Sequence, residues 1–491
     1  MRLPGTYISP ADTGLYYLES RYYNPKIGRF LNADGSLNAN GDLISYNMYA
    51  YCGNNPVNFT KGTHEITVAR VNEGWLLDSI EIVPLTEEIK NLITPSNKLA
   101  IKNPSKKTQA LFDYLLSQRG KSILSGQYIY SDMNDINVIE EVTGKYPAIM
   151  GIDLIDYSPS RVEHGTRGTV IRKAKAWAKK NGIITCSWHW NAPKDLIDED
   201  RPEMRWYDGF RAKATTFNYV KGLQDKNSEE YALMIRDIDV IAEQLKSLMD
   251  SDIPVLWRPL HEAAGGWFWW GAKGAEPYKK LYRYLHDQLT NEYGCHNLIW
   301  VWNGQNPNWY PGDEYVDIIG EDLYLDKHVY SASAAKFSEI LEYSGGKKMI
   351  ALTENGVVFD IDNVIAAGTK WAWFNTWNKN YIIKNGAFSD EYTEAHILKK
   401  TYQSEYVITL DELPDWDTYT PETTDPIKPE RLKGDVNADG ALSVADVVTM
   451  QKWLLTVPET KLSDWKVGDL CEDSRIDVFD LILMKRLLLN N

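Results

Sequence analysis

Residues 257–271 read WRPLHEAAGGWFWWG. The apolar run from Ile253 to Leu260 predicts a buried strand, and this strand ends on His261 and Glu262. Two glycines and four aromatic residues follow. The pattern has two interpretations: a reactive acid beside flat apolar surfaces, or a core patch with a solvated glutamate at its edge. The rest of the chain decides between them.

Outward from this stretch, apolar strands alternate with helical stretches between residues 86 and 412, and amphipathic segments lie between most of the strands. Eight such strands are the count of a (β/α)8 TIM barrel, an α/β fold in which catalysis occurs at the carboxyl ends of the strands. An open doubly wound sheet would need a glycine-rich phosphate turn, and the sequence has none. The predicted strands are 122–128, 147–156, 182–191, 253–262, 297–305, 316–325, 347–356 and 370–377.

The composition fits contact with carbohydrate and a neutral polymer as the substrate. The chain has 18 Trp and 30 Tyr, a large excess over the needs of one core, and its formal net charge is -15. This charge argues against nucleic acid and anionic membranes as partners. No apolar run reaches the ~18 residues of a membrane span, and the four cysteines have no metal-ligand spacing.

Polar residues stand at the predicted strand ends. Glu262 ends the fourth strand and Glu354 the seventh, so the two carboxylates can face each other across the barrel mouth. At a separation of about 5–5.5 Å they would perform retaining glycoside hydrolysis, one as acid/base and the other as nucleophile. The acid/base needs a raised pKa, which the aromatic run 267–270 could provide. The nucleophile must stay ionised, and Tyr324 and Arg258 are its expected hydrogen-bond donors.

These motifs resemble glycoside hydrolase family 26, best known for endo-β-1,4-mannanases. The resemblance rests on Trp257-Arg-Pro-Leu-His-Glu262, on Trp267-Phe-Trp-Trp-Gly271, and on Leu352-Thr-Glu-Asn-Gly356. It implies Glu262 as acid/base and Glu354 as nucleophile, no cofactor for catalysis, and a mannan-type substrate. It further implies that His189 and His261 lie at the subsite of bond cleavage and that Trp267 and Trp377 are sugar platforms. Asp153 and Asp156 are expected to cap loops.

The C-terminal segment 433–491 contains two loops, 435–446 and 469–480, with the oxygen-ligand spacing of an EF-hand. Both lack the preceding helix and end on Asp, so the segment resembles a type I dockerin. The resemblance implies a small all-α module, structural Ca²⁺, and a cohesin partner that contacts Val444, Ala445, Val478 and Phe479. Cys471 and Ser474 depart from the pattern and weaken the second loop. The predicted ligands are Asp435, Asn437, Asp439, Ser443 and Asp446, then Asp469, Asp473, Asp477 and Asp480.

Three further segments complete the expected organisation. Residues 1–60 resemble the Rhs repeat-associated core, as in Gly28-Arg-Phe-Leu31, and residues 61–85 resemble a remnant of a family 35 carbohydrate-binding β-sandwich. We expect neither to act as a toxin shell or to bind sugar. Residues 413–432 are expected to be a linker between the barrel, 86–412, and the dockerin.

Two alternatives remain open from the sequence alone. Family 26 also includes enzymes that act on mixed-linkage β-glucan or xylan, and a barrel of this kind can be a non-catalytic glycan-binding component of a scaffold. A dockerin implies an extracellular, cellulosome-associated protein. The first residues, MRLPGTY, show no hydrophobic signal region and conflict with that location.

Overall fold

The computed structural model describes residues 95–420 without a gap. It also describes residues 433–437, 442–455, 457, 460–463, 465–471 and 476–490, and the backbone of four short strands before residue 31. The expected remnant of a β-sandwich at 61–85 and the predicted ligands Asp439 and Asp473 lie outside the described residues. None of the described helices has the length and apolar character of a membrane span.

The N-terminal strands form an antiparallel sheet in the order β1-β2-β3-β4 within a compact unit that runs from Met1 to Ile80. Their bounds are β1 Thr6–Tyr7, β2 Tyr16–Leu18, β3 Arg21–Asn24 and β4 Arg29–Phe30. The resemblance of this segment to the Rhs core stays a prediction.

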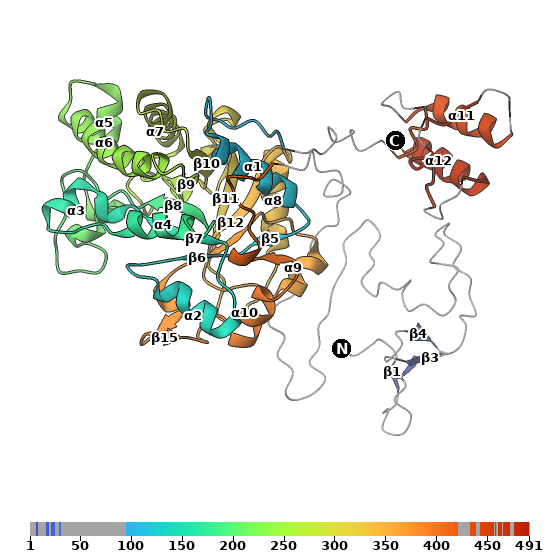
Figure 1. The fold of residues 1–491 in the computed structure, drawn as a ribbon, viewed down its shortest axis with the longest axis horizontal. Helices are drawn as coiled ribbons and strands as arrows, with labels where there is room; N and C mark the ends of the chain where they lie inside the picture. The colour runs from blue at the N-terminus through green and yellow to red at the C-terminus, as the bar shows by residue number, and fades with distance from the viewer. Residues whose placement is uncertain are drawn as a thin grey trace. The chain divides into compact units, whose positions relative to one another are not determined.

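Eight parallel strands close into a barrel, which Figure 1 shows enclosed by helices. Each of the eight predicted strands contains one barrel strand, so the predicted TIM barrel is confirmed. The strands are short and buried on both faces, because one face packs inside the barrel and the other against the helices. They are β6 Gly126–Tyr128, β7 Ile149–Asp153, β8 Ile183–Trp188, β9 Val255–Pro259, β10 Leu298–Trp302, β11 Ile318–Leu323, β12 Met349–Asn355 and β13 Phe374–Thr376.

The helices cover the outer face of the barrel with their apolar sides. The long α6, Glu229–Met249, begins where the Ser228 side chain accepts a hydrogen bond from the backbone N–H of Tyr231 at 3.2 Å. Two acidic residues in its first turn complement the helix dipole. The others are α1 Lys106–Gln118, α2 Asn134–Thr143, α3 Pro159–Glu163, α4 Val170–Ala178, α5 Tyr219–Gln224, α7 Ala275–Asp287, α8 Ala334–Ser344, α9 Ile361–Ala367 and α10 Ala395–Tyr402.

One connection departs from the regular alternation. Every connection between consecutive barrel strands within residues 95–420 contains an α-helix except that between β10 and β11. There the chain forms only two 3₁₀ turns, Pro307–Trp309 and Asp313–Tyr315. The outer face of β11 is therefore covered on this side by turns instead of a helix.

The barrel body extends into the segment expected to be a linker. The indole of Trp416 donates a hydrogen bond to the carbonyl of Asn181 at 2.7 Å, and the rings of Trp416 and Tyr419 pack edge-on against Tyr114 of α1. Leu413 also packs against the core. Two small sheets complete the body, β5 Ile123–Leu124 with β16 Val407–Ile408, and β14 Ile383–Lys384 with β15 Ala387–Phe388.

The C-terminal module has its own small core. Its helices α11, Val444–Leu454, and α12, Val478–Asn490, pack against each other. The predicted all-α module is thus observed in its described residues. The buried apolar residues of this core are Val436, Val447, Met450, Leu481 and Met484.

Candidate active site

The carboxyl ends of the barrel strands gather the polar residues that the sequence singled out. Glu354 lies at the end of β12 and is buried, with 3% of its surface exposed. One of its oxygens accepts a hydrogen bond from the guanidinium of Arg258 on β9, and the other accepts one from the hydroxyl of Tyr324, which follows β11. Both donors expected for this carboxylate are therefore in place, and both favour its ionised form.

Glu262 lies in the turn after β9 and has a left-handed backbone, with φ at 52°. Such a conformation costs energy for a residue other than glycine, and the surrounding structure must hold it in place. The backbone N–H of Glu262 donates to the carbonyl of Asn303 at 2.7 Å, which holds the strained turn. Its side-chain Oε2 accepts a hydrogen bond from the indole of Trp267 at 2.8 Å.

A third carboxylate, Asp322 of β11, lies between the two glutamates. One oxygen of each of Glu262, Asp322 and Glu354 lies within 4.8 Å of those of the other two. Arg258 is fully buried and also donates to Asp322 at 2.8 Å. Among the described residues, Arg258 is the one cation paired with this carboxylate trio, and a single positive charge cannot balance three negative charges.

The shortage of positive charge favours a protonated carboxyl group in the trio. Burial, with Asp322 beside it, raises the pKa of Glu262 to about 7. Burial also raises the pKa of Glu354, but the Arg258 guanidinium bonded to this carboxylate opposes the rise. Arg258 donates to both Asp322 and Glu354, whereas no cation contacts Glu262. Within residues 95–420 the favoured position of the proton is Glu262.

Two histidines form a second polar layer. His189 Nδ1 lies 2.5 Å from Oδ2 of Asp153, and His189 Nε2 lies 3.1 Å from Nε2 of His261. Burial, together with Arg258 and His189, lowers the pKa of His261 well below its ordinary value, so its ring is neutral. Asp153 also accepts hydrogen bonds from the backbone N–H groups of His189 and Ile155. It therefore caps a loop, as expected, and also orients His189.

The aromatic run after Glu262 divides into one exposed ring and three buried ones. Trp267 is 46% exposed, whereas Phe268, Trp269 and Trp270 are buried in the core. Of these four aromatic residues, Trp267 is the one that donates a hydrogen bond to the Glu262 carboxylate. Trp377 is half-buried, with its ring 4.6 Å from Tyr128 and 5.8 Å from His189. Of the two predicted sugar platforms, Trp267 thus lies beside Glu262 and Trp377 lies beside His189.

The sequence analysis assigned Asp322 no role in the site and predicted only a loop-capping role for Asp153. A signal for Asp322 was present, since it stands two residues before Tyr324 and strand alternation places both on one face. Its oxygen Oδ1 accepts from the hydroxyl of Thr353 at 2.7 Å, and Thr353 in turn accepts from the amide of Asn303 at 2.7 Å. These bonds connect the ends of β10, β11 and β12.

The two C-terminal loops are both closed by their last aspartate. The Asp446 side chain accepts from the backbone N–H groups of Asn437 at 3.2 Å and Ser443 at 2.9 Å. The Asp480 side chain accepts from those of Leu470, Cys471 and Asp477. Both aspartates are buried, and Asp435 is 5% exposed. The described part of the first loop carries oxygen-bearing side chains of the kind that suit Ca²⁺. In the second loop the Cys471 thiol and one oxygen each of Asp469 and Asp480 lie within 4.8 Å of one another.

Comparison with known proteins matches this division. The model for glycosyl hydrolase family 26 matches residues 101–412, and that for the dockerin type I domain matches residues 433–489. The chain is 44% identical over 348 residues to the mannan endo-1,4-beta-mannosidase of Thermothelomyces thermophilus, an alignment that covers 70% of this chain and 69% of that protein.

Two solved structures are similar as well. The Podospora anserina GH26-CBM35 β-(1,4)-mannanase aligns with a TM-score of 0.62 and 39% identity, over 69% of this chain and 72% of that one. The β-mannanase of a symbiotic protist of the termite Reticulitermes speratus, complexed with a gluco-manno-oligosaccharide, aligns with a TM-score of 0.57 and 32% identity, over 66% of this chain and 99% of that one. With both glutamates at the strand ends of a closed barrel and these matches, the chain belongs to glycoside hydrolase family 26 and carries a type I dockerin.

Proposed function

We propose that the protein is a retaining endo-β-1,4-mannanase in which Glu262 is the acid/base and Glu354 the nucleophile. The observation that carries the proposal is the placement of these carboxylates, with oxygens within 4.8 Å of each other, one bonded to Arg258 and the other without a cation. A short separation suits direct attack by one carboxylate and leaves no room for a water between them. The named activities of the similar proteins support mannan as the polymer.

The proposed mechanism follows from the different protonation states of the two carboxyl groups, with Glu262 protonated and Glu354 ionised. Glu262 donates its proton to the glycosidic oxygen while Glu354 attacks the anomeric carbon, and a glycosyl–enzyme ester forms. The ester removes the negative charge of Glu354, so the pKa of Glu262 falls. Glu262 then takes a proton from water, which hydrolyses the ester. Hydrogen bonds from Tyr324 and Arg258 stabilise the ionised carboxylate of Glu354 before the ester forms and again when the ester is hydrolysed.

The remaining residues around the pair position the sugar. We propose that His189 and His261 bind hydroxyl groups of the sugar at the point of cleavage, and that Trp267 and Trp377 stack on pyranose rings on its two sides. A neutral His261 can both donate and accept, which suits a hydroxyl group better than a fixed cation does.

The dockerin places this activity on a scaffold. We propose that the module takes structural Ca²⁺ through its two loops, with the oxygens of Asp435, Asn437, Ser443 and Asp446 in the first as the better fit. Exposed apolar side chains on both helices, including Val444 at 65% and Val478 at 55%, suit the docking of a cohesin domain. The protein would then act outside the cell, attached to a cellulosome.

Reducing-sugar release by the full chain tests the enzymatic proposal. The substrates are galactomannan, mixed-linkage β-glucan and xylan, with Glu354→Ala as the control. Release from galactomannan that is lost in the control is the expected result. Release from glucan or xylan alone would overturn mannan as the substrate, and no release from any of them by folded protein would favour a non-catalytic glycan-binding protein.

A further inference from the structure

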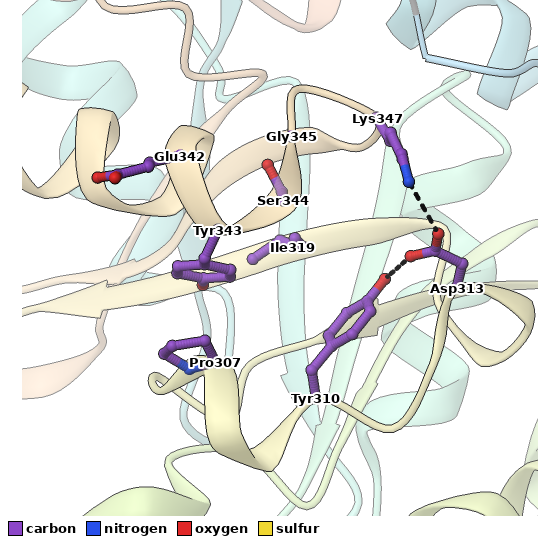
Figure 2. A pocket seen from close by; sticks show the side chains of 9 residues that line it. All are labelled: Pro307, Tyr310, Asp313, Ile319, Glu342, Tyr343, Ser344, Gly345 and Lys347. Atoms are coloured by element: carbon purple, nitrogen blue, oxygen red, sulfur yellow. Dashed lines mark hydrogen bonds and ion pairs between the residues drawn. The ribbon is translucent and has the colours of Figure 1, made fainter.

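A recess lies on the outer wall of the barrel where the connection from β10 to β11 lacks an α-helix. Its volume is about 360 Å³, and it is bounded by the two 3₁₀ turns, β11 and the C-terminal end of α8. Figure 2 shows its lining from close by. Volumes from about 300 Å³ upward are typical of sites for small ligands. None of the residues proposed for catalysis lines it.

The walls of the recess are aromatic and held in place. Tyr310 and Tyr343 flank Ile319 in Figure 2 and come from different elements, the connection and α8. The buried ring of Trp302 meets both of them edge-on, at 5.0 Å from Tyr310 and 6.5 Å from Tyr343. Pro307 adds a further apolar surface. The two rings are therefore preorganised, and little conformational entropy is lost when a ligand lies against them.

The rim of the recess is polar but locally compensated. The hydroxyl of Tyr310 donates to Asp313 at 3.0 Å, and Lys347 Nζ lies 3.9 Å from the same carboxylate. Glu342 adds a second acid at the rim. Two acids and one lysine disfavour an anionic ligand, and the pairing of Asp313 with Lys347 removes the need for a bound cation. A neutral ligand with an apolar face and hydroxyl groups at its edge can pack on the two tyrosine rings and form hydrogen bonds with the polar residues at the rim of the recess.

We propose that this recess is a second, non-catalytic binding site for a short segment of the mannan chain; the identity of the glycan rests on the proposed function above. A pyranose ring has an apolar face of C–H groups that packs on tyrosine rings, and hydroxyl groups at its edge that bond to Asp313 and Lys347. Ile319 faces outward on β11, whereas Asp322 faces the barrel interior. The recess therefore holds a stretch of polymer on the barrel flank, apart from the bonds being cleaved.

Affinity electrophoresis of the full chain through galactomannan tests the site. The Glu354→Ala background leaves the polymer intact. In this background, Tyr310→Ala should raise the dissociation constant for galactomannan several-fold, on the order of the loss of one aromatic anchor. Tyr310→Phe should retain most of the affinity. Lys347→Ala, at a side chain that is 63% exposed, gives a second variant that does not disturb the core. Tyr406→Ala is the matched control, a half-buried tyrosine outside the recess.

Kinetics in the active background separate the two sites. Tyr310→Ala and Lys347→Ala should hydrolyse mannopentaose like the parent, because so short a substrate is held by the cleft alone, and should lose activity on insoluble mannan. If both variants are folded and are retarded as strongly as the parent, while the parent hydrolyses mannan, the recess proposal is overturned and the proposed function stands. A parent that hydrolyses no mannan would instead overturn the proposed function.

Discussion

Replacement of Trp267 by phenylalanine should raise the pH at which activity falls on the alkaline side. The indole of Trp267 donates to Glu262 Oε2 at 2.8 Å, and this bond stabilises the ionised carboxylate. Phenylalanine keeps an apolar ring but removes the donor, so the pKa of Glu262 rises. Glu262 must be protonated to act as acid, and a higher pKa therefore extends activity to higher pH.

The magnitude follows from the strength and exposure of that bond. A hydrogen bond to a charged group contributes about 1.5–3 kcal/mol, and 1.36 kcal/mol corresponds to about one pKa unit. Because Trp267 is 46% exposed, water replaces part of the lost bond. In the parent enzyme, the alkaline limb of kcat/KM should follow the pKa of Glu262, which is about 7. In Trp267→Phe we expect this limb to move to higher pH by roughly half a unit to one unit.

The assay is the pH dependence of kcat/KM on a soluble manno-oligosaccharide. Trp206→Phe is the control, since the indole of Trp206 stacks on His164 at 4.2 Å and has no bond to the acid among the described contacts. An alkaline limb that stays in place, or that moves to lower pH, would refute the role assigned to this hydrogen bond.

Three further predictions concern the charged framework. Arg258→Met should lower the free energy of unfolding by about 3–5 kcal/mol in a denaturant titration, because two buried carboxylates lose their cation, whereas Lys400→Met at an exposed ion pair should be nearly neutral; equal stability of both variants would contradict this. Asp153→Asn should lower kcat/KM about a hundred-fold with the melting temperature unchanged, as His189 loses its orienting partner; parental kcat/KM would contradict it. Removal of Ca²⁺ with EDTA should lower the thermal transition of the dockerin and spare that of the barrel, and calorimetry of Asp446→Ala should reproduce the loss without chelator.

The barrel could be predicted because its signal is local. Each strand is a short apolar run that ends on polar residues, and each is followed by a helical or turn segment, so periodicity alone separates the elements. The connection between β10 and β11 agrees with the same local signal, since the predicted strands 297–305 and 316–325 leave only a short segment between them, and it forms 3₁₀ turns. The structured start of the expected linker depends on the long-range packing of Trp416 and Tyr419 on Tyr114, which composition does not reveal.

The site was predicted through residues that carry recognisable chemistry and missed where a residue acts through another. Glu262 and Glu354 stand in distinctive motifs, and their convergence follows from the barrel. Asp153 follows no motif, and its contact with His189 joins residues 36 positions apart in the sequence. The left-handed backbone of Glu262 is equally invisible, because glutamate has no preference for that conformation.

The inclusion of Asp322 in the carboxylate trio has a specific structural origin. On β11 and β12, Glu321 pairs with Leu352, but the next pair is Asp322 with Glu354, so the register shifts by one residue at Thr353. Simple alternation would place Thr353 and Glu354 on opposite faces, yet Thr353 bonds to Asp322 and Glu354 bonds to Arg258. The bulge therefore turns two consecutive residues toward the barrel interior. It brings a third carboxylate close to the proposed nucleophile, and the negative charge of Asp322 adds to burial in raising the pKa of Glu262.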